Sequence, residues 1–160
     1  MHSSLEDRVA VLETVYKYAL GIDTRDWGLY RYIFTDEIEV DFSSYNGRQG
    51  GRLKGEDWVE MLKPLFSGLA ATQHIMTNPI VTFDDEGATC RIYMQAEHFL
   101  DAHDGSTSYA IGGYYTDRLV IQDNRWLISS VTLTVLWRRG DPEIMVKAFK
   151  KGASAGMKHK

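Results

Sequence analysis

Aspartate and histidine side chains at three positions of this 160-residue chain have the chemistry of an acid–base site. Asp23 follows a run of apolar residues with helical spacing, and His74 and His98 lie in segments typical of β-strands. A carboxylate bound to an imidazole fixes the tautomer of the ring and stabilises the imidazolium that forms when the ring takes up a proton. Such a pair can remove a proton from a carbon atom beside an activating group.

A first helix is expected to position Asp23. Its apolar residues recur every three or four positions and form one stripe: Leu5, Val9, Leu12, Tyr16, Ala19 and Leu20. Gly21 indicates that the helix is ending. If the helix persists to Asp23, the carboxylate points toward the core, where it needs a partner. The alternative is a turn or capping role within residues 23–26.

Both histidines are expected on one face of a β-hairpin. Residues 85–87 suit a three-residue hairpin loop, which places His74 directly opposite His98. The alternating residues that share the second strand's face with His98 are apolar, so both imidazoles should point inward. Asn78-Pro79 interrupts the first strand, and a bulge there would shift the register by one residue. The competing interpretation is a pair of hydrogen-bonded structural histidines.

The rest of the pattern places helices first and strands afterwards. A capped short helix follows Asp26, residues 37–43 alternate like a strand, residues 44–55 are glycine-rich and indicate a loop, and another helix begins at Glu56. Long strands are expected over residues 72–83, 88–100, 107–121 and 125–137, with a bend at Gly112 and Gly113. This order indicates an α+β fold in one domain, residues 1–160, with 138–160 as a C-terminal tail.

A curved sheet with helices on its concave face leaves a natural small-molecule pocket. Five aromatic residues are candidates for lining it, although core packing is the competing role for each: Tyr18, Trp27, Phe42, Tyr45 and Tyr115.

Composition excludes several classes of function. A net charge of −4 and a pI near 5.7 argue against nucleic-acid binding, and no apolar run approaches membrane-spanning length. Cys90 is the only cysteine, so no internal disulfide can form. With no signal segment at the N-terminus, a cytoplasmic protein is expected. The chain lacks HExxH, paired CxxC, GxGxxG, P-loop and GxSxG motifs, so neither a metal nor a cofactor is expected. A metal triad of Asp23, His74 and His98 is a minor alternative.

Several segments together resemble the SnoaL-like and scytalone dehydratase-like branch of the NTF2-like superfamily. Residues 21–27 (GIDTRDW) resemble the end of the first helix in that branch, and residues 71–74 (ATQH) resemble the segment that carries its catalytic histidine. Residues 111–117 and 124–126 look like the hexachlorocyclohexane dehydrochlorinase and bile-acid 7α-dehydratase members. The resemblance extends from Leu5 to about Trp137.

The resemblance implies an NTF2-like cone, with Asp23 and His74 as the acid–base dyad and His98 assisting. It also implies a homo-oligomer, a trimer or a dimer. Tyr18 matches a tyrosine of the bile-acid enzyme. Ile22 and Phe42 stand where scytalone dehydratase has two tyrosines, so scytalone itself is not the expected substrate.

We therefore predict a cofactor-independent lyase that carries out β-elimination, most simply dehydration, on a small apolar cyclic substrate. Two alternatives remain open. The same fold and dyad can serve an isomerase or polyketide cyclase, because proton abstraction is common to all three reactions. The superfamily also contains non-catalytic binding and dimerisation domains.

Overall fold

The computed structural model describes residues 4–101 and 107–156, which form five helices and one sheet. Within these residues, no helix is long and apolar enough to cross a membrane. In chain order the elements are α1 (Leu5–Thr24), α2 (Trp27–Tyr32), β1 (Phe34–Asp41), α3 (Ser43–Asn46), β2 (Gly51–Lys54), α4 (Gly55–Gly68), β3 (Ala71–Asp84), β4 (Gly87–Phe99), β5 (Ser108–Gln122), β6 (Arg125–Gly140) and α5 (Glu143–Gly156).

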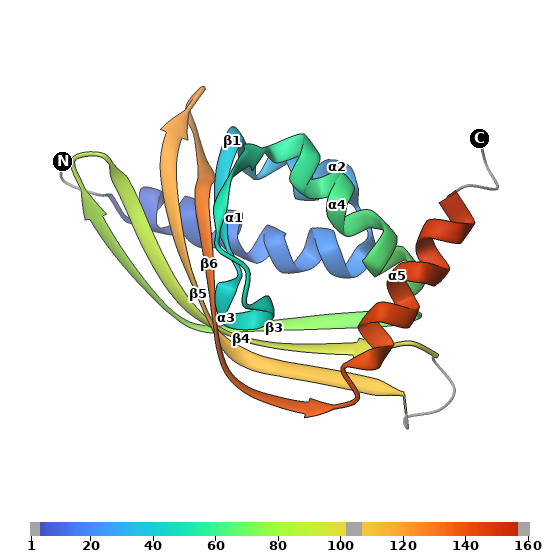
Figure 1. The fold of residues 1–160 in the computed structure, drawn as a ribbon. Coiled ribbons are helices and arrows are strands. Elements are labelled where there is room, and N and C mark those ends of the chain that lie inside the picture. Colours follow the sequence, from blue (N-terminus) through green and yellow to red (C-terminus); the bar gives the residue numbers. More distant parts are fainter. Residues whose placement is uncertain (1–3, 102–106, 157–160) are drawn as a thin grey trace.

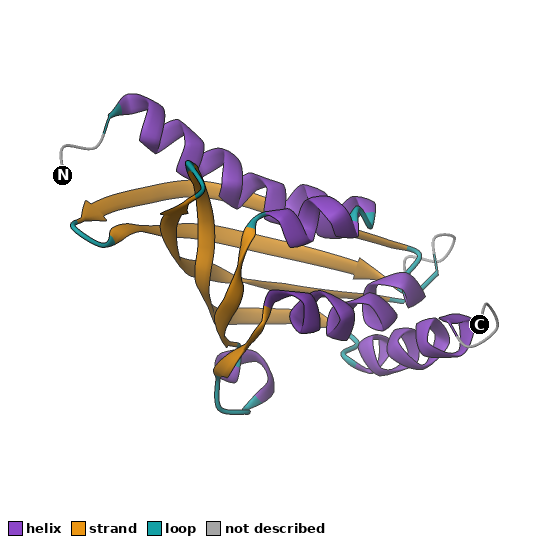
Figure 2. Ribbon diagram, turned by 90° about the horizontal axis from the view of Figure 1, so that it is seen from above, coloured by secondary structure: helices purple, strands orange, loops and turns teal. Residues whose placement is uncertain are grey.

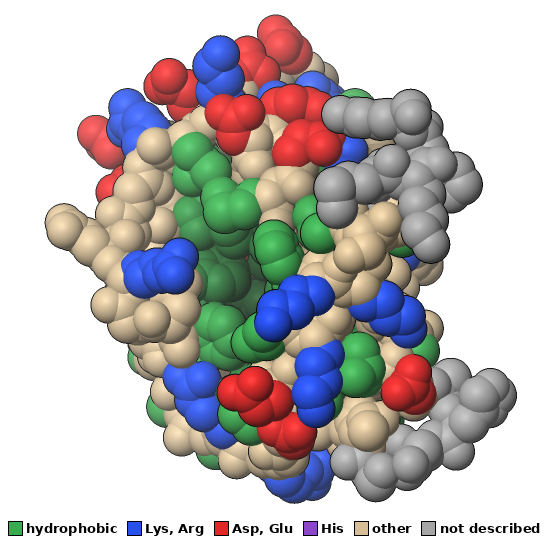
Figure 3. All heavy atoms as spheres, turned by 45° about the vertical axis from the view of Figure 1, so that its right-hand side comes forward, with side chains coloured by type: hydrophobic (Ala, Val, Ile, Leu, Met, Phe, Trp, Pro, Cys, Tyr) green, Lys and Arg blue, Asp and Glu red, His purple; other side chains and the backbone are tan. Residues whose placement is uncertain are grey.

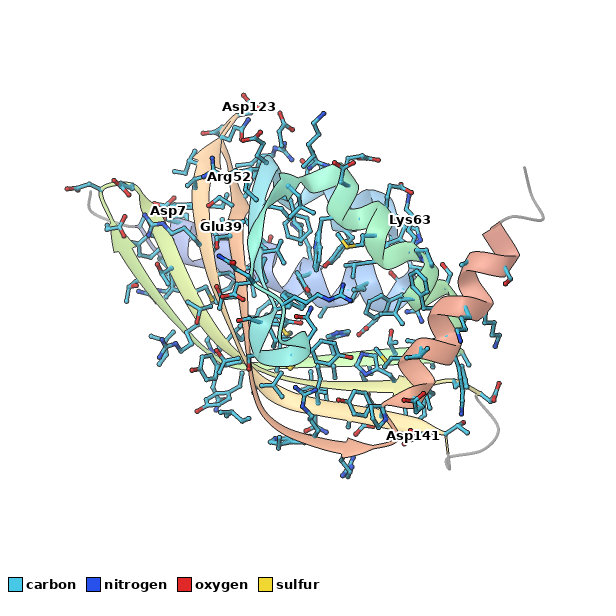
Figure 4. The ribbon with its side chains drawn as sticks, in the orientation of Figure 1. Asp7, Glu39, Arg52, Lys63, Asp123 and Asp141 are labelled. Atoms are coloured by element: carbon cyan, nitrogen blue, oxygen red, sulfur yellow. The ribbon has the colours of Figure 1, made fainter. Side chains whose placement is uncertain are left out.

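The sheet has the strand order β2-β1-β6-β5-β4-β3, and only β1 and β6 are parallel among its described pairs. It curves strongly, and α1, α2 and α4 lie on its concave side (Figure 1). Viewed from above, α1, which starts beside the N-terminus, runs in roughly the same direction as the long strands (Figure 2). Asp123 and Asp141, just outside the two ends of β6, lie at opposite edges of the molecule (Figure 4). The predicted α+β fold, a curved sheet around helices, is confirmed.

The curvature has local causes in the strands. The β5–β6 pairing shifts by one residue between Gly112 and Gly113, the bend that the sequence predicts. A Cβ atom on Gly113 would lie 1.9 Å from the carbonyl oxygen of Thr134, so the close approach of the strands there requires glycine. The β3–β4 ladder has its own irregularity around Asn78, whose φ is 54°.

Helix α1 differs from the prediction in both its face and its length. The residues it buries are Val11, Val15, Tyr18 and Ile22, whereas four members of the predicted stripe are exposed: Leu5, Val9, Tyr16 and Leu20. The helix also runs past Gly21 to Thr24. A Cβ atom on Gly21 would lie 3.0 Å from the backbone of Tyr30, so this glycine marks a close approach of α1 and α2.

The predicted register of the histidine hairpin is wrong by two residues. Asp84 pairs with Gly87 across a shorter turn, and the irregularity near Asn78 adds a further step. His74 therefore faces Ala96 and not His98. Side chains alternate with a period of two, so a two-residue error leaves both histidines on the same face of the sheet.

Two further segments are more ordered than expected. Residues 44–55, predicted as a loop, contain most of α3 and all of β2. The expected tail continues β6 to Gly140 and then forms α5, while residues 157–160 lie outside the described part of the chain. Cβ atoms at Gly68 and Gly152 would lie 1.8 and 1.9 Å from carbonyl oxygens of α5 and α4 respectively. These glycines let the two helices pack in close contact.

Candidate functional site

Asp23 and His74 are in direct contact. The Nδ1 atom of His74 lies 2.7 Å from Oδ1 of Asp23, and the backbone N–H of His74 donates to Oδ2 at 2.6 Å. A carboxylate can only accept from the ring, so Nδ1 carries the proton and Nε2 holds the free lone pair. The side chain of His74 is 4% exposed and that of Asp23 is 18% exposed. The pair thus has the tautomer that a general base needs.

A short hydrogen-bond network on the Asp23 side of the dyad holds it in place. The hydroxyl of Thr72 donates to Oδ1 of Asp23 at 3.1 Å and accepts from the guanidinium of Arg25 at 2.7 Å. Arg25 ends α1 in the left-handed conformation, with φ 61°, and also binds the carbonyl oxygens of Ile22, Asp23 and Phe66. Arg25 and Thr72 thereby join the end of α1 to α4 and β3. Sequence reasoning missed both.

The network keeps Asp23 ionised. Burial alone raises the pKa of this carboxyl group, but the hydrogen bonds from the His74 ring, the His74 backbone N–H and Thr72, together with the electrostatic attraction of the His74 ring, outweigh burial. The net pKa lies below the ordinary value of 3.8. The carboxylate is therefore available at neutral pH to stabilise an imidazolium at His74.

His98 lies beside the dyad in a different state. Its Nδ1 is 3.0 Å from the carbonyl oxygen of Tyr109, which can only accept, so this nitrogen carries the ring's proton. Burial, followed by the nearby His74, lowers the pKa of His98 to about 4. The ring is neutral at pH 7, and its Nε2 can accept a hydrogen bond but not donate one. The centres of the two imidazoles are 5.9 Å apart.

Both imidazoles line an apolar cavity of about 90 Å³ between the sheet, α1, α3, α4 and α5. On the face that Figure 3 shows, hydrophobic side chains line a hollow in the surface. The volume is below the several hundred Å³ of most ligand pockets, so a ring-sized molecule needs some outward movement of the walls. The remaining lining residues are Tyr18, Ile22, Phe42, Tyr45, Trp58, Leu62, Leu65, Phe66, Ile111, Tyr115, Leu133 and Met145.

The aromatic candidates divide into two groups. Tyr18, Phe42, Tyr45 and Tyr115 line the cavity. Trp27 instead lines a polar surface groove that lacks the dyad, so the structure does not bring it to the site.

Apart from the two histidines, the described lining residues with polar side-chain atoms are three tyrosines and Trp58. The ring of Tyr18 packs against those of Tyr30 and Tyr115, with centroids 5.0 and 5.1 Å apart, and Trp58 donates its indole N–H to the hydroxyl of Tyr30 at 3.3 Å. Tyr30 and Trp58 were not among the predicted site residues. Within the described residues, no three histidine, cysteine, aspartate or glutamate side chains converge as they would around a metal ion.

Comparison with known protein families identifies the family of this chain. The model of the SnoaL-like domain matches residues 3–132, which is most of the chain. The protein belongs to the SnoaL-like family. No curated protein matches the sequence.

Several solved structures have a fold similar to that of this SnoaL-like protein. Kfla4162 from Kribbella flavida has 29% identity and a TM-score of 0.80, and the match covers 89% of this chain and 97% of that one. A candidate scytalone dehydratase from Novosphingobium aromaticivorans has 17% identity, a TM-score of 0.74 and coverages of 86% and 89%. The hexachlorocyclohexane dehydrochlorinase LinA-type3 from Novosphingobium barchaimii has 18% identity, a TM-score of 0.70 and coverages of 86% and 92%.

Proposed function

We propose that this SnoaL-like protein is a cofactor-independent lyase that dehydrates a small, apolar, cyclic substrate by β-elimination. The observation that carries the proposal is the contact between His74 and an ionised Asp23 at the wall of an apolar cavity. A base in the wall of an apolar cavity is suited to removing a proton from carbon. Among the described residues, the cavity lining includes no lysine or arginine, which favours an uncharged substrate.

In the proposed reaction, Nε2 of His74 takes a proton from the carbon next to an activating carbonyl group. The electron pair of that C–H bond becomes the new C=C bond, and the C–O bond at the neighbouring carbon breaks. The departing hydroxyl receives a proton and leaves as water. Asp23 stabilises the imidazolium throughout, and no metal or organic cofactor is required.

A tyrosine is the best proton donor for the leaving hydroxyl. The sequence suggested His98 or a tyrosine for this role, but the only proton on neutral His98 is held by the Tyr109 carbonyl. We assign His98 instead to accepting a hydrogen bond from the substrate. Tyr18, Tyr45 and Tyr115 line the cavity, and the rings of Tyr18 and Tyr115 are in contact, with centroids 5.1 Å apart.

An isomerase or cyclase is the second candidate. The Tyr18–Tyr115 hydroxyl pair could stabilise an enolate that His74 creates, and that enolate is common to both reactions. Incubating the protein with a panel of cyclic β-hydroxy ketones and following product mass separates them. Elimination removes the mass of one water, whereas isomerisation leaves the mass unchanged.

The matched variants for this assay are Asp23→Asn and Asp57→Asn. Asp57 is exposed on α4, so its substitution controls for a lost carboxylate elsewhere. We expect Asp23→Asn to lower kcat by about 10²–10⁴-fold and Asp57→Asn to leave it unchanged. Binding of the panel with neither a loss of water nor any isomerised product would instead favour a non-catalytic binding domain.

A further inference from the structure

Asp117 is a carboxyl group buried behind the candidate site. It lies on β5 two residues after Tyr115, so the two side chains share the inward face of the strand. It is 2% exposed, and its neighbours across the sheet, Cys90 on β4 and Val131 on β6, are both fully buried. An acid therefore stands in the middle of an apolar sheet face.

The surroundings of Asp117 favour its neutral form. Its Oδ1 atom has no hydrogen-bond partner in the part of the chain that the structure describes. Burial raises the pKa of this carboxyl group to about 8. An unpaired buried carboxylate is costly, so the group holds its proton at pH 7. A valine would avoid this cost, which suggests that the acid has a function.

The groups that respond to Asp117 are the tyrosines of the cavity wall. A negative charge on Asp117 would raise the pKa of Tyr18 on α1, Tyr30 on α2 and Tyr115 on β5. It would also raise the pKa of Cys90 on β4, and its described neighbour on β6 is the apolar Val131. The ring of Tyr18 lies between those of Tyr30 and Tyr115, with centroids 5.0 and 5.1 Å away, and Tyr18 and Tyr115 line the cavity.

We propose that Asp117 is a positioning residue for the Tyr18–Tyr115 pair, whose protonated form lets these hydroxyls donate into the cavity and whose ionisation suppresses that donation. A tyrosine that protonates the leaving oxygen becomes a tyrosinate until it regains a proton. A neutral Asp117 tolerates the new negative charge, whereas an ionised Asp117 repels it. The catalytic part of this proposal rests on the proposed elimination, but the electrostatic part does not.

The electrostatic part is tested in the free protein, without a substrate. Aspartate labelled with ¹³C at Cγ and tyrosine labelled at Cζ are observed by NMR between pH 5 and pH 10, with assignments from Asp117→Asn, Tyr18→Phe and Tyr115→Phe. We expect the Asp117 signal to titrate near pH 8, and the Tyr18 and Tyr115 signals to move with the same midpoint. An Asp117 that is already ionised at pH 6, or tyrosine signals that do not follow it, overturns the proposal even if the enzyme is active.

The catalytic part is tested by the pH profile of kcat for the dehydration. Asp117→Asn keeps a polar group of the same size but cannot ionise, so its profile should lose the alkaline decline that begins near pH 8 in the wild type. A profile that coincides with the wild type overturns the catalytic role. If Asp117→Asn fails to fold, the wild-type titration still decides the electrostatic part. If the wild type shows no turnover, the proposed elimination fails and the NMR result stands alone.

Discussion

The carboxylate of Asp23 binds His74 at two points, accepting from its ring Nδ1 at 2.7 Å and from its backbone N–H at 2.6 Å. The backbone contact fixes where β3 lies against the end of α1, and the ring contact fixes how the imidazole is turned. One side chain therefore sets both the position and the tautomer of the proposed base. This double role predicts consequences for stability as well as for catalysis.

Replacing Asp23 with asparagine should lower the free energy of unfolding by about 1–3 kcal/mol at pH 7, because hydrogen bonds to a charged acceptor are lost. The pKa of Asp23 is lowered in the folded chain, so its stabilisation is present above the unfolded value of 3.8 and is lost as the pH falls through the folded value. Urea unfolding of wild type and variant at several pH values should show the difference shrinking in acid. A difference that stays constant with pH would mean that the charge of Asp23 contributes nothing.

The chemistry of the dyad could be predicted from sequence more reliably than its geometry. One of two open interpretations had Asp23 facing inward, because it follows Ala19 and Leu20 in a helical stripe, and the other made it a turn or capping residue. The structure buries the other face of α1, through Val11 and Val15, and Asp23 instead reaches β3 from the side of the helix. Both faces of α1 carry apolar residues at helical spacing, so periodicity alone could not choose between them.

The histidine pair shows why an inexact register still gave a useful prediction. Alternation fixes the face of a side chain, whereas pairing depends on turn length and bulges that local sequence specifies weakly. His74 and His98 share a face as predicted, although they do not stand opposite each other. The supporting roles of Arg25 and Thr72 depend on contacts between residues 47 positions apart, for which sequence carried no local signal.

His98 should remain neutral throughout the physiological pH range. Folding lowers its pKa from 6.5 to about 4. The free energy of unfolding is therefore unaffected by its titration above pH 6.5 and declines by up to about 3 kcal/mol as the pH falls to 4. ¹⁵N NMR of the ring should show Nδ1 protonated and Nε2 bare between pH 5 and pH 8. A titration near pH 6.5 would contradict the assigned role as hydrogen-bond acceptor.

Adding a single methyl group at the contact between α4 and α5 should destabilise the protein. A Cβ atom on Gly152 would lie 1.9 Å from the carbonyl oxygen of Pro64, so Gly152→Ala must push α5, which carries the cavity residue Met145, away from α4. We expect a loss of about 1–3 kcal/mol in unfolding free energy, which calorimetry can measure. Gly51→Ala is the matched control, because a Cβ atom there meets nothing within 4 Å. Equal effects at both positions would show that the α4–α5 contact is not close-packed.

Removing a tyrosine hydroxyl should distinguish proton abstraction from protonation of the leaving hydroxyl in the proposed reaction. Tyr115→Phe keeps the ring in the cavity wall but removes a proton donor, so dehydration should slow by about 10²-fold or more. Proton abstraction by His74 should be affected less. Tyr93→Phe is the control, because Tyr93 is 52% exposed. An unchanged dehydration rate in both Tyr115→Phe and Tyr18→Phe would exclude these residues as the acid.

The most direct test of the proposed base is deuterium exchange from D₂O into the α-carbon of cyclic ketones that bind the protein but carry no leaving group. Mass spectrometry follows the exchange, which reports proton abstraction alone. We predict that the wild type and Asp57→Asn catalyse incorporation, and that Asp23→Asn and His74→Gln are slower by about 10²-fold or more. Incorporation by Asp23→Asn and His74→Gln at the wild-type rate would contradict the account.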